Sequence, residues 1–107
     1  MKLIMAIINN DDASAVSGLL AENGFSATKM ATTGGFLMSG NTTLLIGTSD
    51  NKVQRAIELI GKGSRKRKQV VDTSVTAAPH STMSASVEIN VGGATIFVLS
   101  VERFEKV

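Results

Sequence analysis

Residues 29–47 read KMATTGGFLMSGNTTLLIG and form a small, hydroxyl-rich segment around the apolar triplet Phe36–Met38. Glycines let a backbone turn sharply and approach a ligand closely, and threonine hydroxyls add donors and acceptors. An apolar triplet within such a loop is expected to pack beneath it, or to meet a flat apolar partner such as a base or a neighbouring subunit. The segment therefore predicts either a ligand loop or a tight connection that packs on another copy of the chain.

The spacing of Gly35 and Gly40 is similar to that of a phosphate-cradling loop, but two features exclude a nucleoside triphosphatase. Asn41 stands where that loop needs a lysine, and a helix must follow the loop directly. Thr42–Gly47 is instead β-branched and apolar, which predicts a strand. We therefore predict a loop between two strands, with donors suited to a small polar ligand.

The segments on either side of this loop show clear helix and strand patterns. Continuous apolar character over Leu3–Ile8 is typical of a strand buried on both faces. Asp11 and Asp12 predict a solvent-exposed helix N-cap, and Asn23-Gly24 a helix end. The predicted elements are strands over Leu3–Ile8, Phe25–Ala31, Thr42–Thr48, Val87–Val91 and Ala94–Val101, with helices from Asp12 to Asn23 and from an Asp50 cap to Gly61.

Between the second helix and the last strands lies a segment without core periodicity. Arg65–Lys68 is a basic run, expected to be solvated beyond the negative end of the helix dipole, with a phosphate-facing role as the alternative. Gln69–Ser86 is polar and small, so we predict a mobile loop over about residues 64–86 within a single domain, 1–107. The lone His80 in it has no second ligand in view and predicts no metal site. Gly92-Gly93 predicts a tight hairpin between the last two strands.

The composition of the chain excludes several classes of function. With 107 residues, 43% of them apolar, the chain is long enough for one small domain. The absence of cysteine excludes disulfides, thiolate metal sites and a cysteine nucleophile. No apolar run approaches the ~20 residues of a spanning helix and no signal-peptide pattern is present, so we expect a cytoplasmic protein without a membrane partner. A net charge of +2 permits an anionic ligand without indicating nucleic acid.

The element order predicts an α+β fold, a ferredoxin-like split βαβ sandwich with an added C-terminal hairpin strand. Two amphipathic helices cover only one face of such a sheet. Leu3–Ile8 and Leu44–Ile46 carry apolar residues on both faces. We therefore predict that identical copies cover the second face in a closed homo-oligomer.

Three motifs, ATTGGFL (31–37), GNTT (40–43) and VGGATIFV (91–98), closely resemble the PII-like cyclic di-AMP receptor family. The resemblance covers most of the chain outside residues 62–86. It implies a PII-like homotrimer with a nucleotide ligand in clefts between subunits. It also implies a signal-transduction protein that is not an enzyme, needs no cofactor beyond its ligand, and acts through loop ordering read by an unknown protein partner.

Carried over by position, the resemblance implies which residues bind the ligand. Phe36 and Leu37 can sandwich an adenine while the Asn41 amide adds donors and acceptors. Hydroxyls and turn amides suit a phosphate diester. Gly24 and Ser26 stand where family members often carry Asn and Arg, which removes a charge-assisted phosphate contact. The full expected set is Thr28, Thr33, Gly34, Gly35, Phe36, Leu37, Asn41, Gly47 and Phe97, with no catalytic or metal-binding residue.

Other function classes compete with this one. A trimer of the same architecture can bind a different adenine nucleotide, or can serve as an interaction protein with a lost ligand site. An enzyme needs a nucleophile–base pair or convergent carboxylates, and the sequence offers neither. A nucleic-acid module built on Arg65–Lys68 lacks an aromatic stacking platform.

Overall fold

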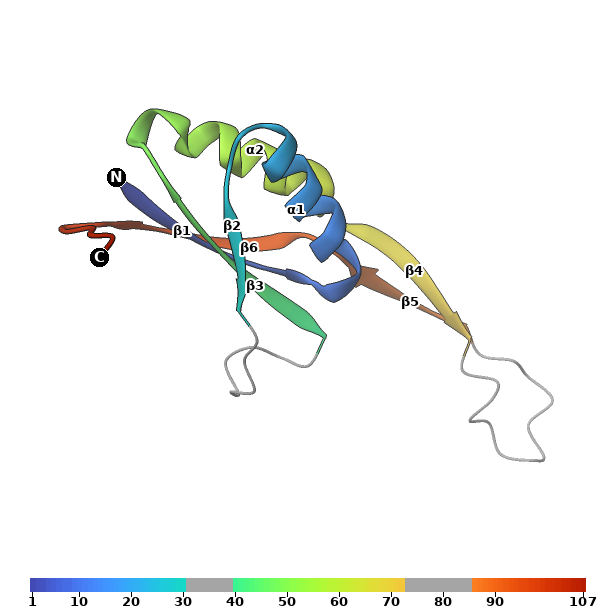
Figure 1. Cartoon of the computed structure of the whole chain (residues 1–107). Helices are drawn as coiled ribbons and strands as arrows, with labels where there is room; N and C mark the ends of the chain where they lie inside the picture. The colour runs from blue at the N-terminus through green and yellow to red at the C-terminus, as the bar shows by residue number, and fades with distance from the viewer. Residues whose placement is uncertain (31–39, 73–85) are drawn as a thin grey trace, which may run out of the picture.

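The computed structural model describes residues 1–30, 40–72 and 86–107. In these residues two α-helices lie over one face of a four-stranded sheet, and a two-stranded arm projects from one end (Figure 1). Short 3₁₀ turns, η1 (Asn10–Asp12) and η2 (Asp50–Lys52), precede the helices. The elements are β1 (Lys2–Asn9), α1 (Ala13–Glu22), β2 (Ala27–Met30), β3 (Asn41–Thr48), α2 (Val53–Gly63), β4 (Arg67–Asp72), β5 (Ser86–Val91) and β6 (Ala94–Ser100).

The main sheet has the strand order β2-β3-β1-β6, and every neighbouring pair is antiparallel. The central strand β1 pairs with β3 from Lys2↔Thr48 to Asn9↔Asn41, and on its other side with β6. This small α+β arrangement is compatible with the predicted ferredoxin-like fold.

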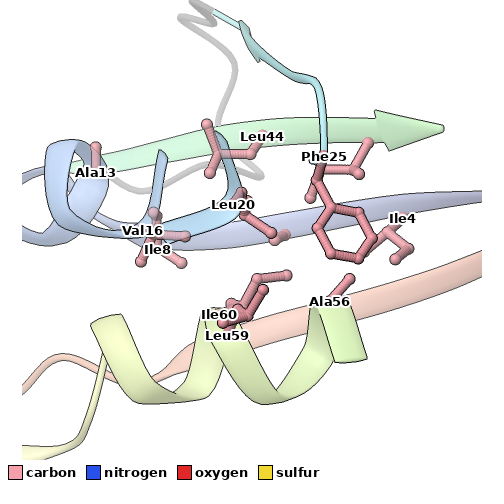
Figure 2. Packing of buried hydrophobic residues seen from close by; sticks show 12 residues of the cluster. Ile4, Ile8, Ala13, Val16, Leu20, Phe25, Leu44, Ala56, Leu59 and Ile60 are labelled. Atoms are coloured by element: carbon pink, nitrogen blue, oxygen red, sulfur yellow. The ribbon is translucent and has the colours of Figure 1, made fainter. Parts of the chain in front are cut away.

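The core lies between the helices and one face of this sheet (Figure 2). Ile4, Ala6 and Ile8 alternate along β1 as fully buried side chains, because successive residues of a strand point to opposite faces. Gly63 lets α1 and α2 approach closely, since a Cβ there would lie 2.8 Å from Val16 Cγ2. The buried apolar set is Ile4, Ala6, Ile8, Ala13, Val16, Leu20, Phe25, Leu44, Ile46, Ala56, Leu59 and Ile60.

The other face of the sheet, called the open face below, is not covered by either helix. Leu3, Met5 and Ile7 of β1 are only half-buried there, unlike their neighbours on the helix side. Phe97 and Leu99 of β6 remain 43% and 44% exposed. The prediction that two helices cover a single face is therefore confirmed for the part of the chain that the structure describes.

The predicted C-terminal hairpin is wrong. β5 pairs with β4, from Arg67↔Val91 to Asp72↔Ser86, whereas β6 pairs with β1 in the main sheet. Gly92 and Gly93 have φ of +86° and +81°, and a Cβ on Gly92 would lie 2.4 Å from the Arg65 carbonyl oxygen. These glycines therefore carry the chain from one sheet to the other across a close neighbour, a role that sequence spacing does not distinguish from a hairpin turn.

The loop predicted from about residue 64 to 86 is shorter in the structure. Arg67–Asp72 forms strand β4 because Ser86–Val91 provides a matching antiparallel partner. Lys68 Nζ also lies 4.0 Å from a Glu88 carboxylate oxygen across the ladder. The rest of the predicted loop, residues 73–85 with Pro79 and His80, lies outside the described residues.

The expected solvent-exposed Asp cap of the first helix is also wrong. Asn9 Oδ1 accepts a hydrogen bond from the Asp11 backbone N–H at 2.8 Å, while the Asp12 side chain makes no cap hydrogen bond. Asp12 is buried, and its two carboxylate oxygens accept from the Arg67 guanidinium at 3.0 and 3.3 Å. This Asp12–Arg67 pair ties the arm to the start of α1, and its two members are 55 residues apart in sequence.

Asp50 likewise makes an ion pair instead of a helix cap. Its carboxylate lies 3.1 Å from the Met1 ammonium, and η2 separates it from the first residue of α2, Val53. The hydrogen bond from that ammonium, together with its positive charge, holds the pKa of Asp50 below its ordinary value. The pair joins the start of β1 to the segment before α2.

Candidate ligand-binding site

Four of the predicted ligand contacts lie in the described residues, and all four belong to the open face. Thr28 pairs with Leu45, and Leu45 with Met5 of the open face. Met5 in turn pairs with Phe97. One row across the sheet therefore contains Thr28, Leu45, Met5 and Phe97. Asn41 and Gly47 lie on β3 at even spacings from Leu45 and therefore share its face. Strand register thus supports a common surface for residues chosen from sequence motifs.

A single subunit does not bring these four residues together in one pocket. Thr28 and Phe97 lie on the two outer strands, three strand spacings or about 14 Å apart. Asn41 and Gly47 are at opposite ends of β3, about 20 Å apart at 3.3 Å per residue. The remaining predicted contacts, Thr33, Gly34, Gly35, Phe36 and Leu37, lie outside the described residues.

Asn41 lines a groove of about 370 Å³ where the arm leaves the main sheet. We call it the Asn41 groove. It brings together the ends of β1 and β5, the starts of β3 and β6, and the segment before β4. Its lining residues are Ile7, Asn9, Asn41, Lys66, Asn90, Val91, Gly92, Gly93, Ala94 and Thr95.

Local hydrogen bonds fix the residues at the start of β3. The Asn10 backbone N–H donates to the Gly40 carbonyl at 2.8 Å, and the Thr42 hydroxyl donates to Asn10 Oδ1 at 2.5 Å. Gly40 has a φ of +97°, a conformation that favours glycine directly before Asn41. The backbone of Asn41 is therefore held in place from both sides.

The side-chain chemistry of the Asn41 groove favours an anion with polar groups around it. Among the described residues, Lys66 is the one charged residue that lines it, and none of the lining residues is a carboxylate. The Asn9 NH₂ group can donate, and Asn9 Oδ1, which accepts from the Asp11 backbone N–H, keeps a second lone pair. A bound anion would meet amide donors and the Lys66 ammonium here.

Sequence reasoning identified Asn41 as a ligand contact but did not place Asn9, Asn90 or Lys66 beside it. The basic run containing Lys66 was interpreted as a solvated surface, with a phosphate-facing role as the alternative. Asn9 lies beside Asn41 because β1 pairs with β3. Asn90 and Lys66 reach the groove because the chain crosses from β5 to β6 beside the segment before β4.

The described ranges, 1–30, 40–72 and 86–107, contain no group of three or more His, Cys, Asp or Glu side chains placed to hold a metal ion. No helix in them is long and apolar enough to cross a membrane.

A family model described as cyclic-di-AMP receptor matches residues 1–107, the whole chain. The chain belongs to the cyclic di-AMP receptor family. This confirms the resemblance drawn from the ATTGGFL, GNTT and VGGATIFV motifs, and it supports a nucleotide ligand and a signalling role.

A solved structure similar to this member of the cyclic di-AMP receptor family is described as a functionally unknown protein from Pediococcus pentosaceus ATCC 25745. The two are 38% identical, and the match covers 99% of this chain and 96% of the other. The TM-score of 0.74 supports the same overall arrangement of helices and strands.

Proposed function

We propose that this protein is a non-enzymatic cytoplasmic receptor that binds cyclic di-AMP in clefts between the subunits of a homotrimer. Ligand binding orders its loops, and a downstream protein reads the change. One observation carries the proposal: Thr28 and Phe97, two of the predicted ligand contacts, share the open face yet belong to opposite edges of the sheet. Residues that share a face but stand about 14 Å apart suit a cleft completed by a second subunit.

The open face supplies the reason for assembly. Met5, Leu45 and Phe97 form an apolar row that neither helix covers. Packing identical copies on it removes apolar surface from water, at about 25 cal/mol per Å² buried. The edge that carries Thr28 on one subunit and the edge that carries Phe97 on its neighbour then flank one crevice.

The ligand chemistry matches the residue types. Cyclic di-AMP offers two flat adenines and two phosphate diesters, so it needs apolar faces and hydrogen-bond donors. Phe36 and Leu37 would contact adenine, and the Asn41 amide would donate to and accept from a base edge. Thr28 and the turn containing Thr33, Gly34 and Gly35 would donate to phosphate oxygens, and Gly47 would allow close approach to β3.

The first test compares nucleotides. We expect cyclic di-AMP to raise the thermal midpoint of the protein more than ADP, ATP or cyclic di-GMP at equal concentration, because only binding to the folded state shifts that midpoint. A midpoint unmoved by near-millimolar cyclic di-AMP would contradict the proposal. A larger shift with ADP or ATP would instead favour a receptor for another adenine nucleotide.

Variants locate the site. We expect Asn41→Ala and Phe36→Ala each to weaken cyclic di-AMP binding about tenfold in calorimetry while leaving the oligomer assembled. Gln54→Ala, on the exposed side of α2, is the matched control and should bind like the wild type. Unchanged affinity in both site variants would place the pocket elsewhere.

Ser26→Arg tests the phosphate contact from the opposite direction. Ser26 is exposed directly before β2, and a guanidinium there would add a charge-assisted bond to a phosphate. We expect about tenfold tighter cyclic di-AMP binding. Ser26→Gln, which adds length without charge, should not reproduce the gain; weaker binding by Ser26→Arg would show that no phosphate lies near this edge.

A further inference from the structure

Lys66 is the cation of the Asn41 groove, and the structure holds it there by a specific backbone arrangement. It lies between α2 and β4, and the connection from β5 to β6 passes beside this segment. The Gly93 backbone N–H donates to the Ser64 carbonyl two residues before Lys66. The crossing chain is thereby fixed beside the lysine.

The two glycines of the crossing leave room for the lysine. A Cβ on Gly93 would lie 3.0 Å from Lys66 Cγ and 3.3 Å from its Cε, so the aliphatic stem runs directly over the glycine. The same atom on Gly92 would collide with the Arg65 carbonyl oxygen. The VGGAT motif, which the sequence assigned to a hairpin, therefore creates the surface along which the Lys66 stem lies.

Arg67 and Lys68, also of the basic run, contact carboxylates instead. Arg67 donates to Asp12 and to the Arg65 carbonyl oxygen, at 3.0 and 3.2 Å, and so belongs to the anchor of the arm. Lys68 faces Glu88 across the ladder. Within the described residues Lys66 has no carboxylate within ion-pair distance, and of the run it alone lines the Asn41 groove.

We infer that Lys66 binds a phosphate of the dinucleotide in the Asn41 groove, with Asn9, Asn41 and Asn90 around it as hydrogen-bonding amides. The inference rests on the proposed function, because it assigns a phosphate contact to the receptor's own ligand. An ammonium with three donors, set among amides and away from carboxylates, stabilises a phosphate oxyanion. Gly92 and Gly93 act as positioning residues for this cation.

The test measures cyclic di-AMP affinity of the full chain by calorimetry at low and high salt. Lys66→Met keeps the stem and removes the charge, so we expect affinity about tenfold weaker at low salt. The loss should shrink at high salt, because screening already weakens the wild-type contact there. Lys66→Arg should retain most of the affinity, since it restores a cationic donor.

Lys62→Met is the matched control. Lys62 lines a separate basic pocket of about 280 Å³ at the end of α2, together with Lys66, but does not line the Asn41 groove. It should bind cyclic di-AMP like the wild type. An equal loss in Lys62→Met would show a general effect of net charge and overturn the assignment to Lys66.

Two other outcomes separate this inference from the proposed function. If the wild type binds and Lys66→Met binds equally well with the same salt dependence, the inference is overturned and the proposed function stands. If the wild type does not bind cyclic di-AMP, both are overturned. The thermal midpoint of each ligand-free variant reports folding, and we expect Lys66→Met to match the wild type because Lys66 is exposed.

Discussion

The two faces of the main sheet carry similar aliphatic side chains in very different surroundings. On the helix side, Ile4 and Leu44 are completely buried. On the open face, the neighbouring residues Leu3 and Leu45 are half-buried and Phe97 is 43% exposed. One face therefore stabilises the subunit, while the other carries predicted contacts of the proposed ligand site. Substitutions on the two faces should differ accordingly in their effects.

Leu44→Ala should cost the most stability. Leu44 is 0% exposed between the sheet and the helices, so truncation leaves a cavity and removes about 2–5 kcal/mol from the free energy of unfolding. Leu45→Ala, the same change one residue along on the open face, is the matched control and should cost clearly less at low protein concentration. Denaturant titrations of both would decide, and equal losses would break the comparison between faces.

Asp12→Asn should have the second largest effect on stability, because it removes the carboxylate that pairs with the Arg67 guanidinium. We expect a loss of about 1 kcal/mol in the free energy of unfolding, at the low end for a charged hydrogen bond because the Arg67 side chain is 45% exposed. The loss should largely vanish in an Arg67→Met background. Additive effects of the two substitutions in a double-mutant cycle would show that the pair is not coupled.

Phe97→Ser should leave the subunit folded and weaken its self-association. Removing this apolar side chain from the open face should raise the dissociation constant by about tenfold, as measured by sedimentation. Val98→Ser is the control, since Val98 is 44% exposed but pairs with Ile4 and so points to the helix side. A folded wild-type monomer persisting at micromolar concentration would contradict the oligomer altogether.

Asp50→Asn should have the smallest effect, because the Asp50 side chain is exposed and its ion pair with the Met1 ammonium lies in solvent. Its pKa is lowered in the folded state, so its contribution to stability is present above the ordinary Asp value of about 3.9 and is lost as the pH falls through the lower folded value. We expect the variant's thermal midpoint to lie slightly below that of the wild type at pH 7 and to meet it in strong acid. A difference between the two midpoints that is equally large at pH 7 and in strong acid would contradict this expectation.

Local patterns in the sequence predicted most of the main sheet and both helices. Apolar alternation and the glycines that end helices depend on neighbours along the chain. The row through Thr28 and Phe97 follows from the order and pairing of the strands. The errors all involve partners distant in sequence: β4 pairs with β5, Asp12 with Arg67, and Gly92 with Arg65. A carboxylate before a helix looks the same whether it caps that helix or meets an arginine 55 residues away.

The residues of the candidate site also fall into two groups: those that the sequence indicates and those that only the tertiary structure brings together. Asn41 and Phe97 belong to short motifs that could be read directly from the chain. Asn9 meets Asn41 through the pairing of β1 with β3, whereas Lys66 and Asn90 join the groove because the chain crosses between two sheets. The predicted ligand loop, residues 31–39, lies outside the described residues. Its contacts therefore stay predictions.

In the described residues the arm joins the main sheet at one end, and the Asn41 groove lies at that end. Its strands extend about 17 Å from the Arg67↔Val91 pair to the Asp72↔Ser86 pair, at 3.3 Å per residue. A rotation of about 10° beside the groove would therefore move the Asp72↔Ser86 pair by about 3 Å. An event too small to alter the packing between sheet and helices would thus become large enough for another macromolecule to detect.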